Sequence, residues 1–525
     1  MTSILTNTGA MTALQTLRGI NQNLAQTQNE ISTGKMIASA KDNSAIWAIS
    51  KVMESDVAGF KAIKSSLSLG ESSVAVARNA TESITSLLTD IKSKIVAAQE
   101  ENVDREKIQT DITQLRNQIT SIVNAAQFNG LNLVKGMDNV DILSSLDRAA
   151  DGTVSSSNIT VERQDMTSTN GTNGVGSTGS TDISAQMLDA AGAAYSGPNN
   201  IDNTGNTAVI EFTSTGGFDI GSTVNVTVAN QTVSLSVTAD DTANGTVRDG
   251  VLAQLQALDL EDISFTATGG GQITITSNRK FEDVGLTVSE TATAAAENVF
   301  IVSANTVTTG FGAAGAQTAT VNQRAEIINF STAVRPSEGN SYQVSLGGTA
   351  YYYTASAGET MEDVARGLKT AIDAAGLEDV STAVSIDATT GQATLKIDND
   401  DAVAIALDVA AGTGGTASGG LFGLDNIDVT TDSGADAALE NIETMIQNAI
   451  DASASFGSAQ SRIETQSEFV SKLTDSLTAG IGTMVDADLE EASARLQALQ
   501  VQQQLGIQSL SIANQAPQTI LALFR

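Results

Sequence analysis

Acidic side chains come nearest to a catalytic or metal-binding arrangement in this sequence. Adjacent carboxylates occur at Asp240-Asp241, Asp400-Asp401 and Glu490-Glu491, and such a pair can serve as general acid and general base. The run Asp398-Asn399-Asp400-Asp401 offers oxygen ligands for calcium but lacks the spacing of an EF-hand loop. Runs of this kind are most often solvated surface, so we expect no catalytic residue, no cofactor and no metal site.

The residue types that are missing remove most other chemistry. The chain contains no Cys and no His, which excludes disulfides, thiol nucleophiles, Cys/His zinc sites and Ser-His-Asp triads. Gly269-Gly270-Gly271 precedes an expected strand rather than a helix, so it predicts a hairpin turn and not a phosphate-binding loop. The sequence therefore favours a structural protein over an enzyme.

The charge of the chain is strongly negative and unevenly placed. Net charge is -33, and the stretch from Asp151 to Thr430 holds 33 acidic and 9 basic residues. A polyanion repels nucleic acid and anionic membranes, so we expect neither as a partner. Residues 1–17 are uncharged and interrupted by polar residues, unlike a cleavable signal peptide. We therefore expect export, if it occurs, to use another signal.

Both ends of the chain show the spacing of long helices. Apolar residues recur at steps of three and four, or of seven, as in helices that pair in coiled coils. The residues that we expect to mediate core packing and assembly are Leu14, Leu17, Leu24, Ile31, Ile108, Ile112, Leu115, Ile119, Ile122, Leu489, Leu496, Leu499, Leu510 and Leu523.

The scarcity of charge at the two ends is as informative as the spacing. From Leu496 to Phe524 there is no charged residue, and the first charge from the N-terminus is Arg18. A solitary amphipathic helix keeps a charged outer face, whereas Gln, Asn, Ser and Thr occupy those positions here. We therefore expect these helices to be buried all round by packing against copies of the same chain.

The middle of the chain predicts two related α+β modules. Ile210-Glu211-Phe212-Thr213 is matched 118 residues later by Ile328-Asn329-Phe330-Ser331. Strand-like alternation surrounds both segments, and each copy holds one helical stretch, Val247–Leu258 and Met361–Ala375. We expect the two modules to lie in tandem.

A β-hairpin is predicted before these modules. Val140–Leu146 and Ile159–Arg163 have the composition of strands, and Asp151-Gly152 between them is a turn signal.

Several motifs at the ends resemble one known family. The run from Asn29 through Gly34 to Lys35, with Ala40-Lys41-Asp42-Asn43-Ser44-Ala45 after it, is similar to the N-terminal signature of bacterial flagellins. Ala126-Gln127-Phe128-Asn129-Gly130, Asp486-Ala487-Asp488 and Ala513-Asn514-Gln515-Ala516-Pro517-Gln518 resemble later motifs of that family. The resemblance covers roughly residues 1–140 and 435–525, and the middle repeats resemble modules inserted in some flagellins and filament-cap proteins.

The resemblance implies a structural subunit that is exported unfolded by a type III apparatus and polymerises into an extracellular filament for motility. It implies ends that become ordered as coaxial helices inside the filament. It also implies other flagellin subunits, an export chaperone and hook-associated or cap proteins as partners. The expected divisions are 1–43 (N-terminal filament core), 44–165 (helical core with hairpin), 166–320 and 321–434 (outer modules), 435–480 (returning helix) and 481–525 (C-terminal filament core).

Two other readings remain open from the sequence. A hook–filament junction protein shares much of this pattern, although the ending Asn514–Gln518 favours a flagellin. A surface adhesin would explain the strand-rich residues 140–430 but not the uncharged helical ends. The predicted class is therefore an α+β multidomain protein with paired terminal helices and β-rich outer domains.

Overall fold

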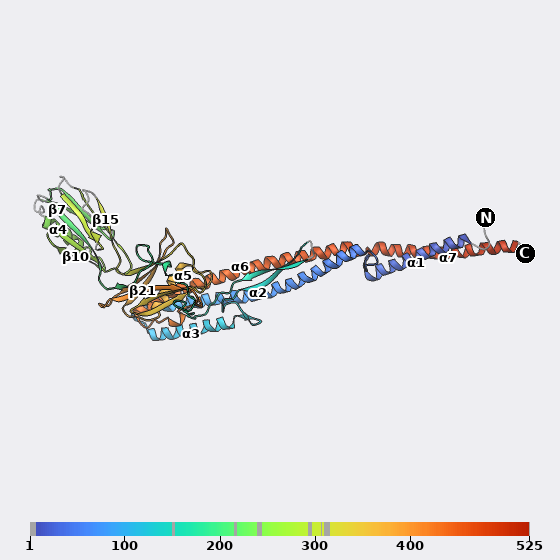
Figure 1. The fold of residues 1–525 in the computed structure, drawn as a ribbon, viewed down its shortest axis with the longest axis horizontal. Coiled ribbons are helices and arrows are strands. Elements are labelled where there is room, and N and C mark those ends of the chain that lie inside the picture. Colours follow the sequence, from blue (N-terminus) through green and yellow to red (C-terminus); the bar gives the residue numbers. More distant parts are fainter. Residues whose placement is uncertain are drawn as a thin grey trace.

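The computed structural model describes residues 7–149, 153–214, 218–238, 244–291, 297–305, 307–308 and 316–523. They form a long helical rod that carries β-rich modules at one end (Figure 1). The first and last helices lie side by side at the other end, so the chain runs along the rod and returns. This is the predicted α+β multidomain fold with paired terminal helices.

The helices begin at side-chain caps. Asn7 accepts a hydrogen bond from the backbone of Ala10, Asn43 from Ala45 and Ile46, and Thr431 from Gly434, which satisfies amides that the first helical turn leaves free. The helical segments are α1 (Thr8–Thr33), α2 (Ser44–Ala98), α3 (Arg105–Ala125), η1 (Ser184–Gln186), α4 (Asn244–Gln256), α5 (Met361–Asp373), η2 (Leu424–Asn426), α6 (Asp432–Val485) and α7 (Leu489–Leu523).

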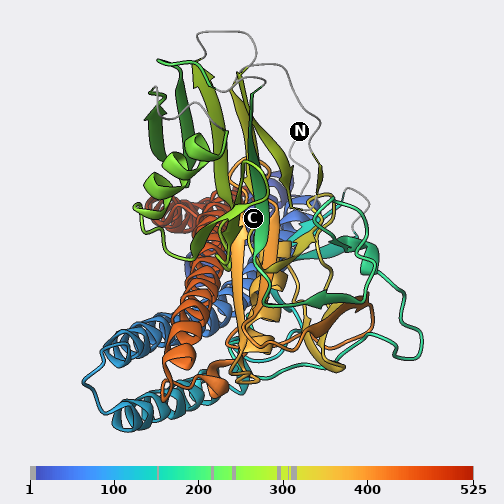
Figure 2. The same ribbon diagram turned by 90° about the vertical axis from the view of Figure 1, so that its left-hand side faces the viewer.

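Helices α2 and α6 pair along the rod, and α3 folds back beside them (Figure 2). Their shared core includes Ile84, Leu88 and Phe456, each 0% exposed. The predicted seam of α3 faces this core. Ile112 and Ile119 are buried, and its other members, Ile108, Leu115 and Ile122, pack against the core partly buried.

A long hairpin closes the helical core. Strands β3 (Val140–Arg148) and β4 (Val154–Val161) pair antiparallel, with Val140 opposite Val161, which confirms the predicted hairpin. Its predicted turn at Asp151-Gly152 lies outside the described residues. Strands β1 (Gln127–Phe128) and β2 (Leu131–Asn132) form a smaller hairpin after α3.

The first outer module consists of two sheets and helix α4 around one core. Its sheet orders are β10-β11-β7-β13-β14 and β15-β12-β8-β9. The predicted turn at Gly269-Gly270-Gly271 joins β10 to β11. The strands are β7 (Asn206–Ser214), β8 (Thr223–Val228), β9 (Gln231–Ser236), β10 (Ile263–Thr268), β11 (Gln272–Ser277), β12 (Val284–Thr291), β13 (Glu297–Ala304), β14 (Val307–Thr308) and β15 (Gln317–Val321).

The second outer module repeats this arrangement around α5. Its sheet orders are β19-β20-β16-β5 and β18-β17-β21-β6. The strands are β5 (Met187–Leu188), β6 (Asn199–Ile201), β16 (Glu326–Phe330), β17 (Ser341–Leu346), β18 (Thr349–Thr354), β19 (Val380–Ile386), β20 (Ala393–Asn399) and β21 (Ile405–Gly412).

The two modules share a topology but differ in chain order. In the first module β13 and β15, which follow the helix, complete the two sheets. In the second module β5 and β6, which precede the whole first module, occupy the equivalent sheet positions. The repeat is therefore circularly permuted, and the first module is inserted between β6 and β16 of the second.

This insertion changes the expected division of the chain. The predicted boundary at residue 166 assigned Met187–Leu188 and Asn199–Ile201 to the first module, whereas both strands pair within the second. The reason is physical, since β16 and β21 need partners for their free backbone edges. The chain enters and leaves the first module at one place, where the Asn206 side chain donates to the Gln323 carbonyl at 2.7 Å.

Candidate assembly interface at the chain ends

Helices α1 and α7 form an antiparallel pair at the end of the rod. The Asn7 amide donates to the Ala513 carbonyl at 2.8 Å, and the Gln503 amide donates to Asn21 Oδ1 at 2.7 Å. Gly506 allows close approach, because an added Cβ would lie 3.1 Å from Leu17 Cδ1. The pair is held by small residues and side-chain amides, with little charge.

The predicted packing residues divide between the two faces of this pair. Leu499 is 7% exposed, whereas Leu14 and Leu489 are 39% and 53% exposed. The side chain of Leu523 lies outside the described residues. The remaining predicted members are partly buried: Leu17, Leu24, Ile31, Leu496 and Leu510.

The pair also exposes large apolar side chains that its heptad spacing does not predict. Val501, Leu505 and Ile512 are 56%, 58% and 69% exposed. Their spacing of four and seven residues places them on one face of α7, turned away from Gly506 and Leu499. Met11 of α1 is 64% exposed as well. The sequence indicates this surface only by the lack of charged residues between these apolar positions, where an exposed helix face would normally carry them.

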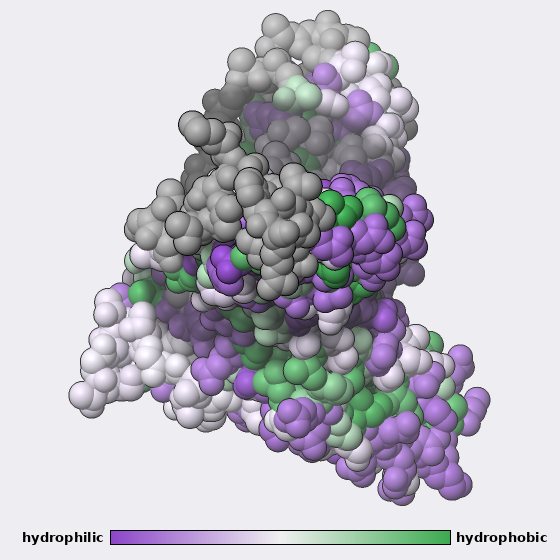
Figure 3. All heavy atoms as spheres, turned by 90° about the vertical axis from the view of Figure 1, so that its right-hand side faces the viewer, coloured by the Kyte–Doolittle hydropathy of each residue, from purple (hydrophilic) through white to green (hydrophobic). Residues whose placement is uncertain are grey.

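Figure 3 looks at the molecule from the end that carries this pair. Hydrophobic residues reach the surface there beside hydrophilic ones. Exposed apolar groups that gather on one region of a surface mark an interaction site more often than solitary ones do. We call Met11, Leu14, Val501, Leu505 and Ile512 the apolar stripe.

The family-like motifs from the two ends meet in one joint between the helix pairs. Gly34 ends α1 in the left-handed conformation (φ 68°), which glycine adopts without strain. Its carbonyl accepts from Ala487, and Lys35 forms a β-bridge with Asp486. Asp488 then accepts hydrogen bonds from the amides of Glu490 and Glu491 and caps the start of α7.

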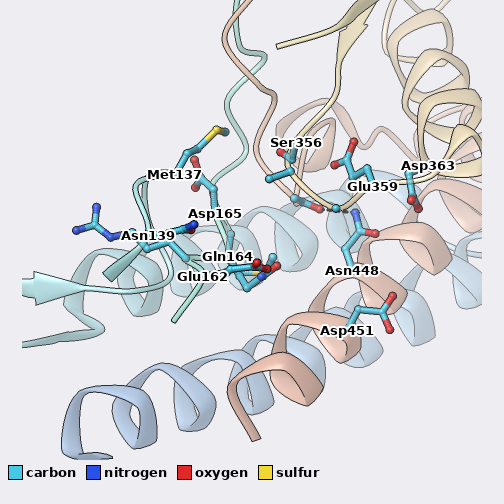
Figure 4. Close-up of a pocket in the computed structure, with 15 residues that line it drawn as sticks. Met137, Asn139, Glu162, Gln164, Asp165, Ser356, Glu359, Asp363, Asn448 and Asp451 are labelled. Carbon is cyan, nitrogen blue, oxygen red and sulfur yellow. Dashed lines mark hydrogen bonds between the residues drawn. The ribbon is translucent and has the colours of Figure 1, made fainter. Parts of the chain in front are cut away.

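A polar pocket of about 290 Å³ lies where the second module meets the rod. Figure 4 shows residues from the segment after β4, the loop before α5 and helix α6 around it, among them Asp165, Glu359 and Asp451. Burial raises the pKa of Glu359 to about 7, although its carboxylate accepts a hydrogen bond from the Tyr353 hydroxyl at 2.8 Å. Within the described residues, no three acidic side chains are placed to hold a metal ion.

The carboxylates considered for calcium are engaged elsewhere. Arg324, which is 9% exposed, forms ion pairs with Asp398 and Asp400, and Lys280 also pairs with Asp400. These contacts join the first module to the second. Among the described helices, none is both long and apolar enough to cross a bilayer.

Comparison with known proteins agrees with this architecture. The model of the bacterial flagellin N-terminal helical region matches residues 4–139, and that of the flagellin C-terminal helical region matches residues 439–524. Flagellin A of Rhizobium meliloti is 32% identical over 533 residues, which cover 100% of both chains. Flagellin B of the same species is 31% identical, also over 100% of both chains.

These matches extend from the terminal helices through the β-rich modules. The chain therefore belongs to the bacterial flagellins. It is a structural subunit of the flagellar filament rather than an enzyme. The solved flagellar hook associated protein-3 from Legionella pneumophila aligns with 83% of this chain and 98% of its own, at 10% identity and a TM-score of 0.30, and that alignment adds nothing to the assignment.

Proposed function

We propose that the α1/α7 pair drives polymerisation and that the apolar stripe is the surface by which it contacts neighbouring subunits. The exposed side chains of Val501, Leu505 and Ile512 are the observation that carries this proposal. Burying one such side chain contributes about 1.5–3 kcal/mol. A filament offers that burial many times over, because every subunit meets several copies.

The proposal also implies that assembly depends on a growing filament. A helix pair with one shared stripe is marginal alone in water, and ordering it carries an entropic cost. Neighbouring subunits supply the missing burial, so addition to an existing end is favoured over association of free monomers. The predicted divisions follow the same logic, with residues 1–43 and 481–525 forming the inner core and the β-rich modules forming the outer surface.

We extend the proposal to partners and location. A chain with an uncovered apolar stripe needs protection before assembly, which supports an export chaperone that binds the ends. We also propose that this chain contacts hook-associated and cap proteins at the two limits of the filament. Export would place the assembled subunits outside the cell.

The test is seeded growth of purified monomer on filament fragments. The full chain is expected to elongate the seeds into long filaments. A chain that stops after Leu505 lacks the last turns of α7, and it should fail to elongate while its modules stay folded by circular dichroism. Normal filaments from this truncated chain would contradict the proposal.

A further inference from the structure

A buried polar cluster joins the second outer module to the rod. Lys369 and Asp373 lie one turn apart on α5, and Asn441 lies on α6. Lys369 and Asn441 are 4% and 8% exposed, and the side chain of Asp373 is 7% exposed. An amine, a carboxylate and a primary amide are thus brought together away from water.

The contacts within this cluster align three reacting groups. Lys369 Nζ lies 2.7 Å from Asp373 Oδ2 and donates to Asn441 Oδ1 at 3.4 Å. The Asn441 amide nitrogen donates to the same Asp373 oxygen at 3.1 Å. The Thr370 hydroxyl donates to Asn441 Oδ1 at 3.3 Å. One carboxylate oxygen therefore bridges the amine and the amide nitrogen, while a hydroxyl polarises the amide carbonyl.

We propose that Lys369 and Asn441 join in an intramolecular amide bond that ties the second outer module covalently to the helical core. Lys369 Nζ lies 3.4 Å from Asn441 Oδ1, the oxygen bonded to the carbon that the amine would attack, so the two groups are held close together, as an intramolecular reaction requires. Burial excludes the water that would otherwise compete as nucleophile. The product is a side-chain amide between α5 and α6, within a single chain.

The reaction balances without any external reagent. Lys369 Nζ gives a proton to Asp373, and the free amine attacks Cγ of Asn441. The Thr370 hydroxyl stabilises the charge that develops on Oδ1. Asp373 then returns the proton to Nδ2 and the Cγ–Nδ2 bond breaks, so ammonia leaves; the second proton of Nζ passes to Asp373 and departs with the ammonia as ammonium. An Nζ–Cγ amide replaces the side-chain amide, and nothing is oxidised or reduced.

Two features of the surroundings define the controls. Glu440, with 57% of its side chain exposed, also contacts Lys369 at 3.2 Å, but it lies outside the bridge between amine and amide. At the junction between the two modules, Lys396 Nζ donates to the Gln323 side-chain oxygen at 2.7 Å and to the Phe281 carbonyl. Asp283 lies near this pair but accepts from the backbone amide of Gln323. Among the described hydrogen bonds, no carboxylate joins Lys396 to the side-chain amide nitrogen of Gln323, so this pair should stay unlinked.

The bond would link α5 to α6 covalently, at the contact through which hydrodynamic force on the second outer module reaches the rod. It closes a loop from Lys369 to Asn441 that contains the last turn of α5, three strands of the second module and the start of α6. Such a closure restricts the unfolded chain as a disulfide does, in a protein that has no cysteine.

Mass spectrometry of the purified full chain, as monomer and as filament, tests the proposal. The expected result is a mass lower by one ammonia, about 17 Da, as nucleophilic displacement at the amide requires. Digestion should give a branched peptide that joins Lys369 to Asn441 and none that joins Lys396 to Gln323. Lys369→Met, Asp373→Asn and Asn441→Ala should each restore the unmodified mass, whereas Glu440→Gln should keep the link.

A folded wild-type chain with the unmodified mass would overturn the proposal, as would an ammonia loss that maps to another residue. The presence or absence of the branched peptide in the wild-type chain tests the proposal without any variant. The test therefore remains valid even if a variant fails to fold. A fully linked product in Asp373→Asn would also contradict the proposed proton transfer.

Discussion

The rod contains two antiparallel helix pairs that differ in what covers their outer faces. The α2/α6 pair is flanked by α3 and the β3/β4 hairpin, and its core reaches 0% exposure at Ile84 and Phe456. In the α1/α7 pair, the most buried of the described hydrophobic side chains are Ala492 and Leu499, at 6% and 7% exposed. The same kind of helix pairing thus buries its apolar side chains within the subunit in one region and leaves part of them exposed in the other.

The difference shows how one chain can be stable before assembly and still be able to polymerise. A third layer lets α2/α6 bury apolar side chains within the subunit. The α1/α7 pair has one shared stripe, and we propose that neighbouring subunits cover its exposed apolar stripe. On this proposal, stability and assembly depend on different parts of the same rod.

The largest expected effect lies in the covered pair. Phe456→Ala removes a fully buried ring from the α2/α6 core, and we expect it to lower the free energy of unfolding by about 3–5 kcal/mol. Denaturant unfolding of the monomer followed by circular dichroism measures this change. A loss below about 1 kcal/mol, typical of surface changes, would show that this core is looser than the structure indicates.

A second prediction separates the regions by their response to pH. Glu359, in the module attached to α2/α6, has a folded-state pKa of about 7 because of burial, above its ordinary value of 4.5. It therefore stabilises the fold below about pH 4.5 and loses this contribution as the pH rises through 7.

The ionisation of Glu359 should lower the free energy of unfolding by up to about 3 kcal/mol between pH 5 and 8. Glu359→Gln should abolish this fall and should therefore be more stable than the wild-type chain at pH 8. Thermal unfolding across that range measures it. The α1/α7 pair is uncharged from Leu496 to Phe524, so Gln substitutions there should leave the pH profile unchanged. If Glu359→Gln keeps the wild-type dependence of stability on pH, groups other than Glu359 cause that dependence.

The smallest expected effect on the monomer is at the open pair. Ile512→Gln changes a side chain that is already 69% exposed, so monomer stability should stay within about 0.5 kcal/mol. In the filament the lost burial is about 1.5 kcal/mol or more, which raises the critical concentration for elongation about tenfold. Sedimentation of seeded filaments measures this concentration.

Ile220→Gln is the matched control, because this outer-module side chain is 63% exposed. It should change neither monomer stability nor the critical concentration. An equal rise for both variants would show that exposed isoleucine in general, and not the apolar stripe, controls elongation.

Much of the architecture is readable from the sequence because local patterns determine it. The α3 seam, the β3/β4 hairpin and helices α4 and α5 follow from periodicity and turn residues. The inserted topology is not readable, because a linear repeat cannot show that β5 and β6 complete sheets whose other strands begin about a hundred residues later.

The candidate interface was only partly predictable for a similar reason. The heptad from Leu489 to Leu510 suggests one packed stripe, but among the predicted residues of α7 the most buried is Leu499, which lies in line with Ala492 and Gly506. Helical periodicity locates the faces without telling which face meets a partner. The cluster of Lys369, Asp373 and Asn441 was equally hidden, since nothing local links α5 to α6.

Hydrogen exchange of the free monomer and of the assembled filament tests the central claim most directly. The account predicts that amides of α2 and α6 are protected in both states, while those of α1 and α7 exchange rapidly in the monomer and become protected in the filament. Equal protection of α1 and α7 in the two states would contradict it, because their burial would then owe nothing to neighbouring subunits.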